Sequence, residues 1–470
     1  MGSNAASPLD AGVDAVSARV MQDRYRCPEG FFDFALGSKL SREAGFFKFG
    51  PNATGYGQSS RGVAKDRDSV LCDALHYVSV ENAKVRLPFD PNDVIDNLRL
   101  ERYAASPWSV RERVLKRIYY WLRPVTNRSM RKGIQRFRAG HWRKVPFPSW
   151  PVDTSVENIC EGLMLLSLRA KGVDGVPFIW FWPKGARGCV LMTHDVETEV
   201  GRDHCPELLD INDSFAIKAS FQIVPQDRYD VSPAFLDQIR TQGSEVCVQD
   251  LNHDGRLFDD REEFRRRASI INRYGKEFGA RGFRSAVLYR RPEWFEDLEF
   301  SFDMSIPNVA RLDPQRGGCC TVMPYFIGDI LELPVTTVQD YTLFHLLRER
   351  SIDLWKRQCE MILAKYGLIS FIVHPDYVIE PDTRAVYEAL LSWLQELRAK
   401  QPLWFALPHE IDAWWRARQR MTVVKQGDSW RIEGEGAERA TLAFARMVDG
   451  ELVYEQANSP LSAGCSASKA

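Results

Sequence analysis

Long apolar runs, a leader-like start and paired cysteines are all missing from this sequence of 470 residues. No apolar run approaches the roughly 18 residues that a membrane-spanning helix needs. Residues 1–7 contain neither a basic nor an apolar stretch, so we expect no secretory signal. The 10 cysteines form no CxxC pair, which excludes a zinc ribbon and favours reduced, buried thiols. Together these absences predict a cytoplasmic protein that does not cross a membrane.

Several common enzyme signatures are absent as well. The sequence contains no Walker A motif, no Gly-rich fingerprint after its first regular strand, no GxSxG and no HExxH. A net charge of -1 shows no overall excess of either sign. The hydrophobic fraction of 44% and the charged fraction of 27% are typical of a globular protein with a substantial core.

Changes in composition divide the chain into regions. We expect disordered ends, because both ends are rich in small and polar residues. The predicted regions are a disordered start (1–20), an N-terminal region (21–150), a linker or entry segment (151–184), a regular strand–helix domain (185–418), a small β appendage (421–458) and a disordered tail (459–470).

The N-terminal region includes a strongly basic segment at 111–144. It carries twelve Lys and Arg residues against one acid, Glu112. Apolar residues at helical spacing predict an amphipathic helix there. We favour a solvated basic helix that packs on its own domain, and the alternative is a helix that rests on an anionic membrane surface. A nucleic-acid partner is not expected.

The region 185–418 alternates short buried strands with helical periods. This alternation predicts a parallel sheet with crossover helices, either a barrel or a doubly wound sheet. The expected strands lie at 189–193, 219–224, 245–248, 282–285, 300–303, 330–334, 368–373 and 404–407, and clear helical periods lie at 261–278, 352–366 and 383–399.

Polar residues follow the ends of these strands. In a (β/α) barrel the carboxyl ends of the strands form the functional face, so we expect these side chains to converge. The candidate residues are Asp195, Glu197, Gln249, His253, Arg284 and His374.

This region resembles the polysaccharide deacetylase family, the NodB-homology carbohydrate esterases. Five short motifs occur in the family's order: Thr193-His194-Asp195-Val196-Glu197, Glu245-Val246-Cys247-Val248-Gln249-Asp250-Leu251-Asn252-His253, Gly282-Phe283-Arg284-Ser285, Asp303 and Ile372-Val373-His374-Pro375-Asp376. The resemblance covers about half of the chain. It implies a distorted (β/α) barrel with an N-terminal extension and a C-terminal β appendage, and it leaves those additions unexplained.

The resemblance also implies an activity and a set of roles. The family hydrolyses carbon–nitrogen bonds of N-acetylated saccharides with the help of a divalent metal ion, Zn²⁺ or another. Asp195 would accept the proton of the attacking water, and Arg284 would hold Asp195 ionised. His374 would protonate the departing amine. Glu197, His253 and Gln249 would hold the metal. The substrate would be a saccharide, with a lipid-linked saccharide as one form that suits a membrane contact through 111–144.

Two positions depart from the family pattern. Gln249 stands where the first metal-binding His is expected, and Val196 stands at a usual acidic position. A neutral amide oxygen is a poorer partner for Zn²⁺ than imidazole. Three hypotheses therefore remain open: a weak or different metal site, a catalyst without metal, or an inactive barrel that binds a saccharide or a partner enzyme.

Each candidate residue also has a structural interpretation. Asp195 could cap the helix that follows its strand. His253 could cap a loop, and Arg284 could pair with any acid at the mouth of the barrel. For His374 we favour catalysis over a buried structural histidine.

Overall fold

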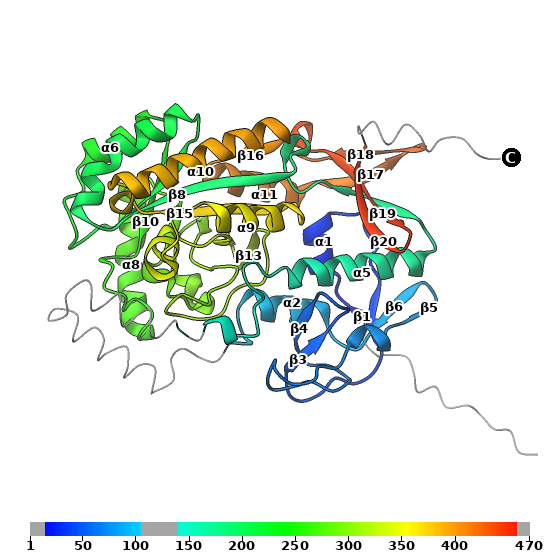
Figure 1. The fold of residues 1–470 in the computed structure, drawn as a ribbon. Coiled ribbons are helices and arrows are strands. Elements are labelled where there is room, and N and C mark those ends of the chain that lie inside the picture. Colours follow the sequence, from blue (N-terminus) through cyan, green and yellow to red (C-terminus); the bar gives the residue numbers. More distant parts are fainter. Residues whose placement is uncertain (1–14, 105–139, 141, 458–470) are drawn as a thin grey trace, which may run out of the picture. The chain divides into compact units, whose positions relative to one another are not determined.

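The computed structural model describes residues 15–104, 140 and 142–457, which form two compact units (Figure 1). The first unit contains residues 1–98, 155–180 and 419–470, and the second contains 99–154 and 181–418. The basic segment predicted at 111–144 lies outside the described residues except for Gly140 and Trp142–Lys144, and the predicted tail at 459–470 lies outside them completely.

The first unit joins three stretches that are far apart in the sequence. Its helices and strands are β1 (Ala15–Val16), α1 (Arg19–Tyr25), β2 (Phe34–Leu36), β3 (Gly45–Lys48), β4 (Thr54–Gly57), β5 (Ser79–Glu81), β6 (Lys84–Leu87), α2 (Pro91–Arg99), α5 (Ser155–Lys171), β7 (Gly175–Ile179), β17 (Thr422–Gln426), β18 (Ser429–Glu433), β19 (Leu442–Val448) and β20 (Glu451–Gln456). β19 pairs with both β20 and β7, so the strands expected in an appendage share a sheet with the expected linker. Within the predicted disordered start, residues 15–20 already contain β1 and the first residues of α1.

The second unit follows the predicted strand–helix order. Its main elements are β8 (Gly188–Val196), α6 (Glu199–Ser214), β9 (Ala219–Ile223), α7 (Pro233–Thr241), β10 (Glu245–Gln249), α8 (Arg261–Glu277), β11 (Gly282–Arg284), β12 (Phe302–Asp303), β13 (Tyr325–Ile327), β14 (Ile330–Glu332), α9 (Asp353–Leu363), β15 (Leu368–Val373), α10 (Pro381–Lys400), β16 (Leu403–Phe405) and α11 (Pro408–Arg420). All eight predicted strands overlap observed ones, and except for β16, whose residues are half-buried, these short apolar runs are largely buried on both faces.

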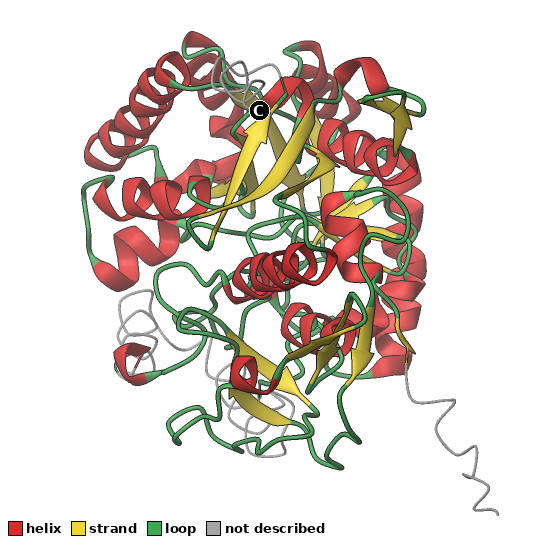
Figure 2. Cartoon of the chain, turned by 90° about the vertical axis from the view of Figure 1, so that its right-hand side faces the viewer, coloured by secondary structure: helices red, strands yellow, loops and turns green. Residues whose placement is uncertain are grey.

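These strands form one curled sheet in the order β13-β14-β12-β11-β10-β9-β8-β15, with helices on its outer side (Figure 2). Every neighbouring pair from β14 to β15 in that order is parallel, so their carboxyl ends lie at one edge. Polar side chains begin three of the crossover helices, where Thr198, Ser232 and Asp260 accept backbone hydrogen bonds as N-caps.

The sheet is an open, curled half-barrel, which agrees with the predicted distorted (β/α) barrel only in part. Among the described residues, no regular ladder joins β14 to β15. Pro334 follows β14 and has no N–H to continue a ladder, which gives a physical reason for the break. The next residues span the gap differently: the Thr336 hydroxyl donates to the Leu368 carbonyl at 2.7 Å, and the Thr337 N–H donates to the Ser370 carbonyl at 3.3 Å. The strands therefore form an open, curled sheet in the order given above.

A buried ion pair fixes the loops beyond β11. Arg290 is fully buried and donates from Nε to Glu101 Oε2 at 2.5 Å. Glu101 also accepts the backbone N–H of Gly318 at 2.5 Å, so one carboxylate ties together three separate segments.

None of the helices within the described ranges is both long enough and apolar enough to span a membrane.

We expect Glu101→Ala to lower the free energy of unfolding by about 3–5 kcal/mol, because it leaves the Arg290 guanidinium buried without its counter-charge. Urea denaturation of the full chain measures this loss. Glu299→Ala is the matched control, since Glu299 pairs with Lys276 at 2.6 Å on the surface and should change stability little. Equal effects of the two substitutions would contradict the assigned role of Glu101.

Candidate active site

Side chains from four parallel strands converge at the carboxyl edge of the sheet. Asp195 and Glu197 lie at the end of β8, Gln249 ends β10, Arg284 ends β11 and His374 follows β15. Gln249 and Arg284 are direct partners in the β10–β11 register. The backbone of β11 begins with Gly282, where any Cβ would collide with the ring of Phe302 on β12. A glycine is therefore required there for the close packing that brings Arg284 into the site.

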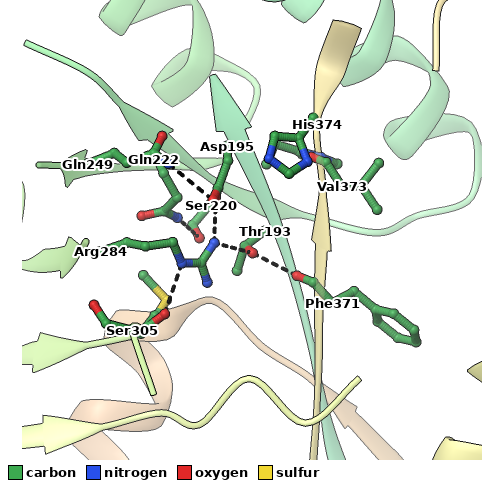
Figure 3. A network of polar contacts seen from close by, with 12 residues as sticks. Thr193, Asp195, Ser220, Gln222, Gln249, Arg284, Ser305, Phe371, Val373 and His374 are labelled. Atoms are coloured by element: carbon green, nitrogen blue, oxygen red, sulfur yellow. Dashed lines mark hydrogen bonds and ion pairs between the residues drawn. The ribbon is translucent and has the colours of Figure 1, made fainter. Parts of the chain in front are cut away.

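Arg284 and Asp195 form the most deeply buried ion pair of this site (Figure 3). Arg284 Nη1 lies 2.5 Å from Asp195 Oδ1 and 2.8 Å from the Thr193 hydroxyl. Arg284 Nε donates to the Met304 carbonyl at 2.9 Å. The Thr193 hydroxyl in turn donates to the Phe371 carbonyl at 2.6 Å, so the network connects β8, β11 and β15. Asp195 is not a helix cap, because α6 is capped by Thr198.

Glu197 lies at the centre of three nitrogen groups. Its Oε1 is 2.7 Å from His253 Nε2, 3.2 Å from Gln249 Nε2 and 3.5 Å from His374 Nε2. Gln249 Nε2 also donates to Asp195 Oδ2 at 3.2 Å, and Figure 3 shows this amide turned toward Asp195. Burial by itself raises the pKa of Glu197, but the two imidazoles outweigh burial and hold that pKa well below its usual range. Glu197 is therefore a carboxylate anion at neutral pH.

His374 is paired with a residue that the sequence analysis missed. Asp340 Oδ1 lies 2.7 Å from His374 Nδ1, and Asp340 Oδ2 accepts the His374 backbone N–H at 2.7 Å. Burial favours neutral imidazole, but the charges of Asp340 and Glu197 outweigh it and raise the pKa of His374 well above its usual range. Burial raises the pKa of Asp340, and the contacts with His374 only partly offset that. Asp340 begins the helical segment that continues into the π-helical turn Thr342–Leu347, so no strand pattern marks it in the sequence.

Asp303, which the fourth motif suggested, lies elsewhere. It pairs in register with Glu332 on β14, and both carboxyls are buried. Burial raises the pKa of Asp303 to about 6 and raises the pKa of Glu332 well above its usual value. The Ser305 hydroxyl donates to Asp303 Oδ2 at 2.7 Å. These contacts join the ends of neighbouring strands, and Asp303 has no hydrogen bond to the candidate site residues among the contacts of the described residues.

The structure also contains a group of side chains that could hold a metal ion. Donor atoms of Asp195, Glu197 and His374 all lie within 4.8 Å of one another. This set differs from the predicted one, Glu197, His253 and Gln249, and shares only Glu197 with it. All six sequence candidates nevertheless meet in one cluster.

Comparisons with known proteins add a likeness of fold. No family profile and no curated protein sequence matches this chain. Among solved structures, a Mycobacterium smegmatis protein described as a polysaccharide deacetylase is 20% identical with a TM-score of 0.42, and the match covers 53% of this chain and 98% of that one. The peptidoglycan deacetylase PdaC from Bacillus subtilis is 10% identical with a TM-score of 0.32, over 48% and 90% of the two chains. A family 4 acetyl xylan esterase from Clostridium thermocellum, solved with a cobalt ion, is 15% identical with a TM-score of 0.31, over 48% and 91%.

The names of these structures agree with the resemblance seen in the sequence motifs. Their TM-scores stay below 0.5, so the functional argument depends on the geometry of the site itself.

The His374–Asp340 pair predicts a measurable shift in titration. In the wild type we expect the His374 imidazole to stay protonated at pH 7. Asp340→Asn should lower the pKa of His374, because it removes the carboxylate charge that counteracts the effect of burial. NMR titration of the labelled imidazole measures both values, and an unchanged pKa in Asp340→Asn would contradict the pairing.

The same shift makes stability depend on pH. The folded-state pKa of His374 lies above the unfolded value of about 6.5. The stability that the charged imidazole contributes is therefore fully present below about pH 6.5 and is lost as pH rises through the folded-state pKa. In Asp340→Asn this fall in unfolding free energy above pH 6.5 should be smaller.

Proposed function

We propose that this protein is a hydrolase that cleaves the amide bond of an N-acylated saccharide. One observation carries the proposal: two buried pairs, Asp195–Arg284 and His374–Asp340, place a carboxylate and an imidazole with donor atoms within 4.8 Å of each other. Amide hydrolysis needs a base for the attacking water and an acid for the departing nitrogen. The saccharide as substrate class rests on the five sequence motifs.

Asp195 is the general base in this proposal. Its Oδ1 accepts a hydrogen bond from the guanidinium of Arg284. The guanidinium is fixed in turn by the Met304 carbonyl and the Thr193 hydroxyl, so the carboxylate cannot rotate away from the mouth of the sheet. A water molecule bonded to Asp195 would lose its proton as its oxygen attacks the acyl carbon.

His374 is the general acid. An amine leaves an amide only if its nitrogen gains a proton, and the raised pKa of His374 keeps a proton available at neutral pH. Asp340 holds Nδ1, which leaves Nε2 to face the reacting groups. Glu197 lies 3.5 Å from that nitrogen and adds to the field that keeps it charged. No step is assigned to a metal ion, because Gln249 and His253, two of the predicted metal ligands, already face the third, Glu197, with their side-chain nitrogens.

The alternative is an inactive barrel that binds a saccharide or a partner enzyme. Gln249 favours this alternative, since it replaces an expected metal-binding His. The intact base and acid pairs favour catalysis, because a binding surface does not require a buried carboxylate and a charged imidazole at this spacing. The two hypotheses differ in one outcome, the release of a free amine.

We expect Asp195→Asn and His374→Gln each to lower kcat/KM for N-acylated oligosaccharides by about 100- to 10,000-fold, because each removes a proton-transfer group. The assay is the release of free amine and free acid. His409→Gln is the matched control. His409 lies 3.0 Å from Glu245, the first residue of β10, and so at the opposite end of that strand.

A wild type that releases no amine from any N-acylated saccharide, although folded, would favour the binding hypothesis. Full turnover in both Asp195→Asn and His374→Gln would contradict the assigned roles. Loss of turnover in His409→Gln would show that the assay reports general damage to the fold.

A further inference from the structure

Building on the function proposed above, we propose that the site is constructed to work without a resident divalent metal ion. The side-chain nitrogens of Gln249 and His253 face Glu197 at the position where the family resemblance places the cation, and Arg228 lies on the other side of the His253 ring.

Gln249 presents its amide nitrogen to the carboxylates. Nε2 donates to Asp195 Oδ2 and to Glu197 Oε1, both at 3.2 Å, and the side chain is 1% exposed. An amide NH₂ has two donors and no lone pair for a metal. Turning the amide around would place its oxygen against two carboxylates, and the resulting repulsion sets the observed orientation. In this orientation Gln249 joins the two acids as a donor, and the Nε2 that faces them offers no lone pair to a metal ion.

His253 also faces Glu197 with a proton. Arg228 Nη2 donates to His253 Nδ1 at 3.0 Å and to the His253 carbonyl at 3.0 Å. An arginine keeps its protons, so Nδ1 accepts and the ring proton lies on Nε2, which is 2.7 Å from Glu197 Oε1. A metal-binding histidine has the reverse arrangement: its second nitrogen donates to a carboxylate or a carbonyl, and the first offers a lone pair.

The charge of Arg228 acts in the same direction. A permanent cation bonded to the ring of a metal ligand repels a second cation a few ångströms away, and partial burial weakens the screening by water. The Gln249 amide and the His253 ring nitrogen meanwhile both face the same oxygen of Glu197, so that oxygen is already surrounded by N–H groups.

The other candidate set of metal ligands, Asp195, Glu197 and His374, also faces N–H groups. Both oxygens of Asp195 already accept hydrogen bonds, from Arg284 and from Gln249. A metal ion at that position would have to displace the amide and lie beside the Arg284 guanidinium. Both candidate ligand sets therefore contain a bonded guanidinium and inward-facing N–H groups, and neither fits a divalent ion.

Metal binding by the full chain tests this proposal without any need for turnover. The comparison uses the wild type, Gln249→His, and the double variant Gln249→His with Arg228→Gln. The double variant restores a lone pair and removes the cation. Gln226→His is the matched control, because the Gln226 side chain bonds to the Tyr274 hydroxyl at 3.0 Å and lies outside the hydrogen-bond network of Asp195 and Glu197. The probe is Co²⁺, followed by equilibrium dialysis and by its visible absorption.

We expect the wild type to purify without a stoichiometric metal ion and to keep its Tm after treatment with a chelator. The double variant should bind one Co²⁺ per chain roughly 10- to 100-fold more tightly than the wild type, and Gln226→His should resemble the wild type. Circular dichroism establishes that each variant is folded.

Two results would overturn the proposal. One is a wild type that holds one ion per chain, with a Tm that falls on chelation. The other is a folded double variant that binds Co²⁺ no more tightly than the wild type, since Gln249 and Arg228 would then not be what excludes the ion. Both are independent of the proposed function, because a protein that turns over no saccharide would give the same binding data.

Discussion

The ion pair between Asp195 and Arg284 is the interaction on which the rest of the site depends. Taking a guanidinium fully out of water costs several kcal/mol unless a carboxylate and further acceptors receive it. Arg284 meets this need with Asp195, the Met304 carbonyl and the Thr193 hydroxyl. Because Thr193 also donates to β15, the same network connects three strands of a sheet that does not close by backbone ladders. The Asp195–Arg284 pair thus connects strands of the sheet and positions the proposed base.

Around that pair, different surroundings distinguish the proposed base, Asp195, from the proposed acid, His374. Asp195 faces a guanidinium, whereas His374 faces two carboxylates, Asp340 and Glu197. The two carboxylates raise the pKa of His374 well above its usual range, so the site places a protonated imidazole near a carboxylate, which is the arrangement that general acid–base catalysis needs. The half-buried Glu197 is held in place by the side-chain nitrogens of Gln249 and His253.

The sequence predicted the strand order of the second unit well, because parallel strands buried on both faces appear as short apolar runs. It also predicted the side chains at the strand ends, since Asp195, Arg284 and His374 each follow such a run directly. Asp340 was not predicted as a site residue, because no periodicity marks a strand end before it. The open sheet escaped because closure depends on the geometry after Pro334. The pairing of β19 with β7 depends on contacts between distant segments, which local patterns do not contain.

The most direct test of the account is hydrolysis by protein that has been stripped of metal. Chelator-treated wild type is incubated with N-acetylated oligosaccharides in heavy-oxygen water, and the released acid and amine are analysed by mass spectrometry. The account predicts free amine together with one heavy oxygen in the released carboxylate, at the rate of untreated protein, and loss of both products in Asp195→Asn. Products that vanish on chelation and return only with added metal would contradict it.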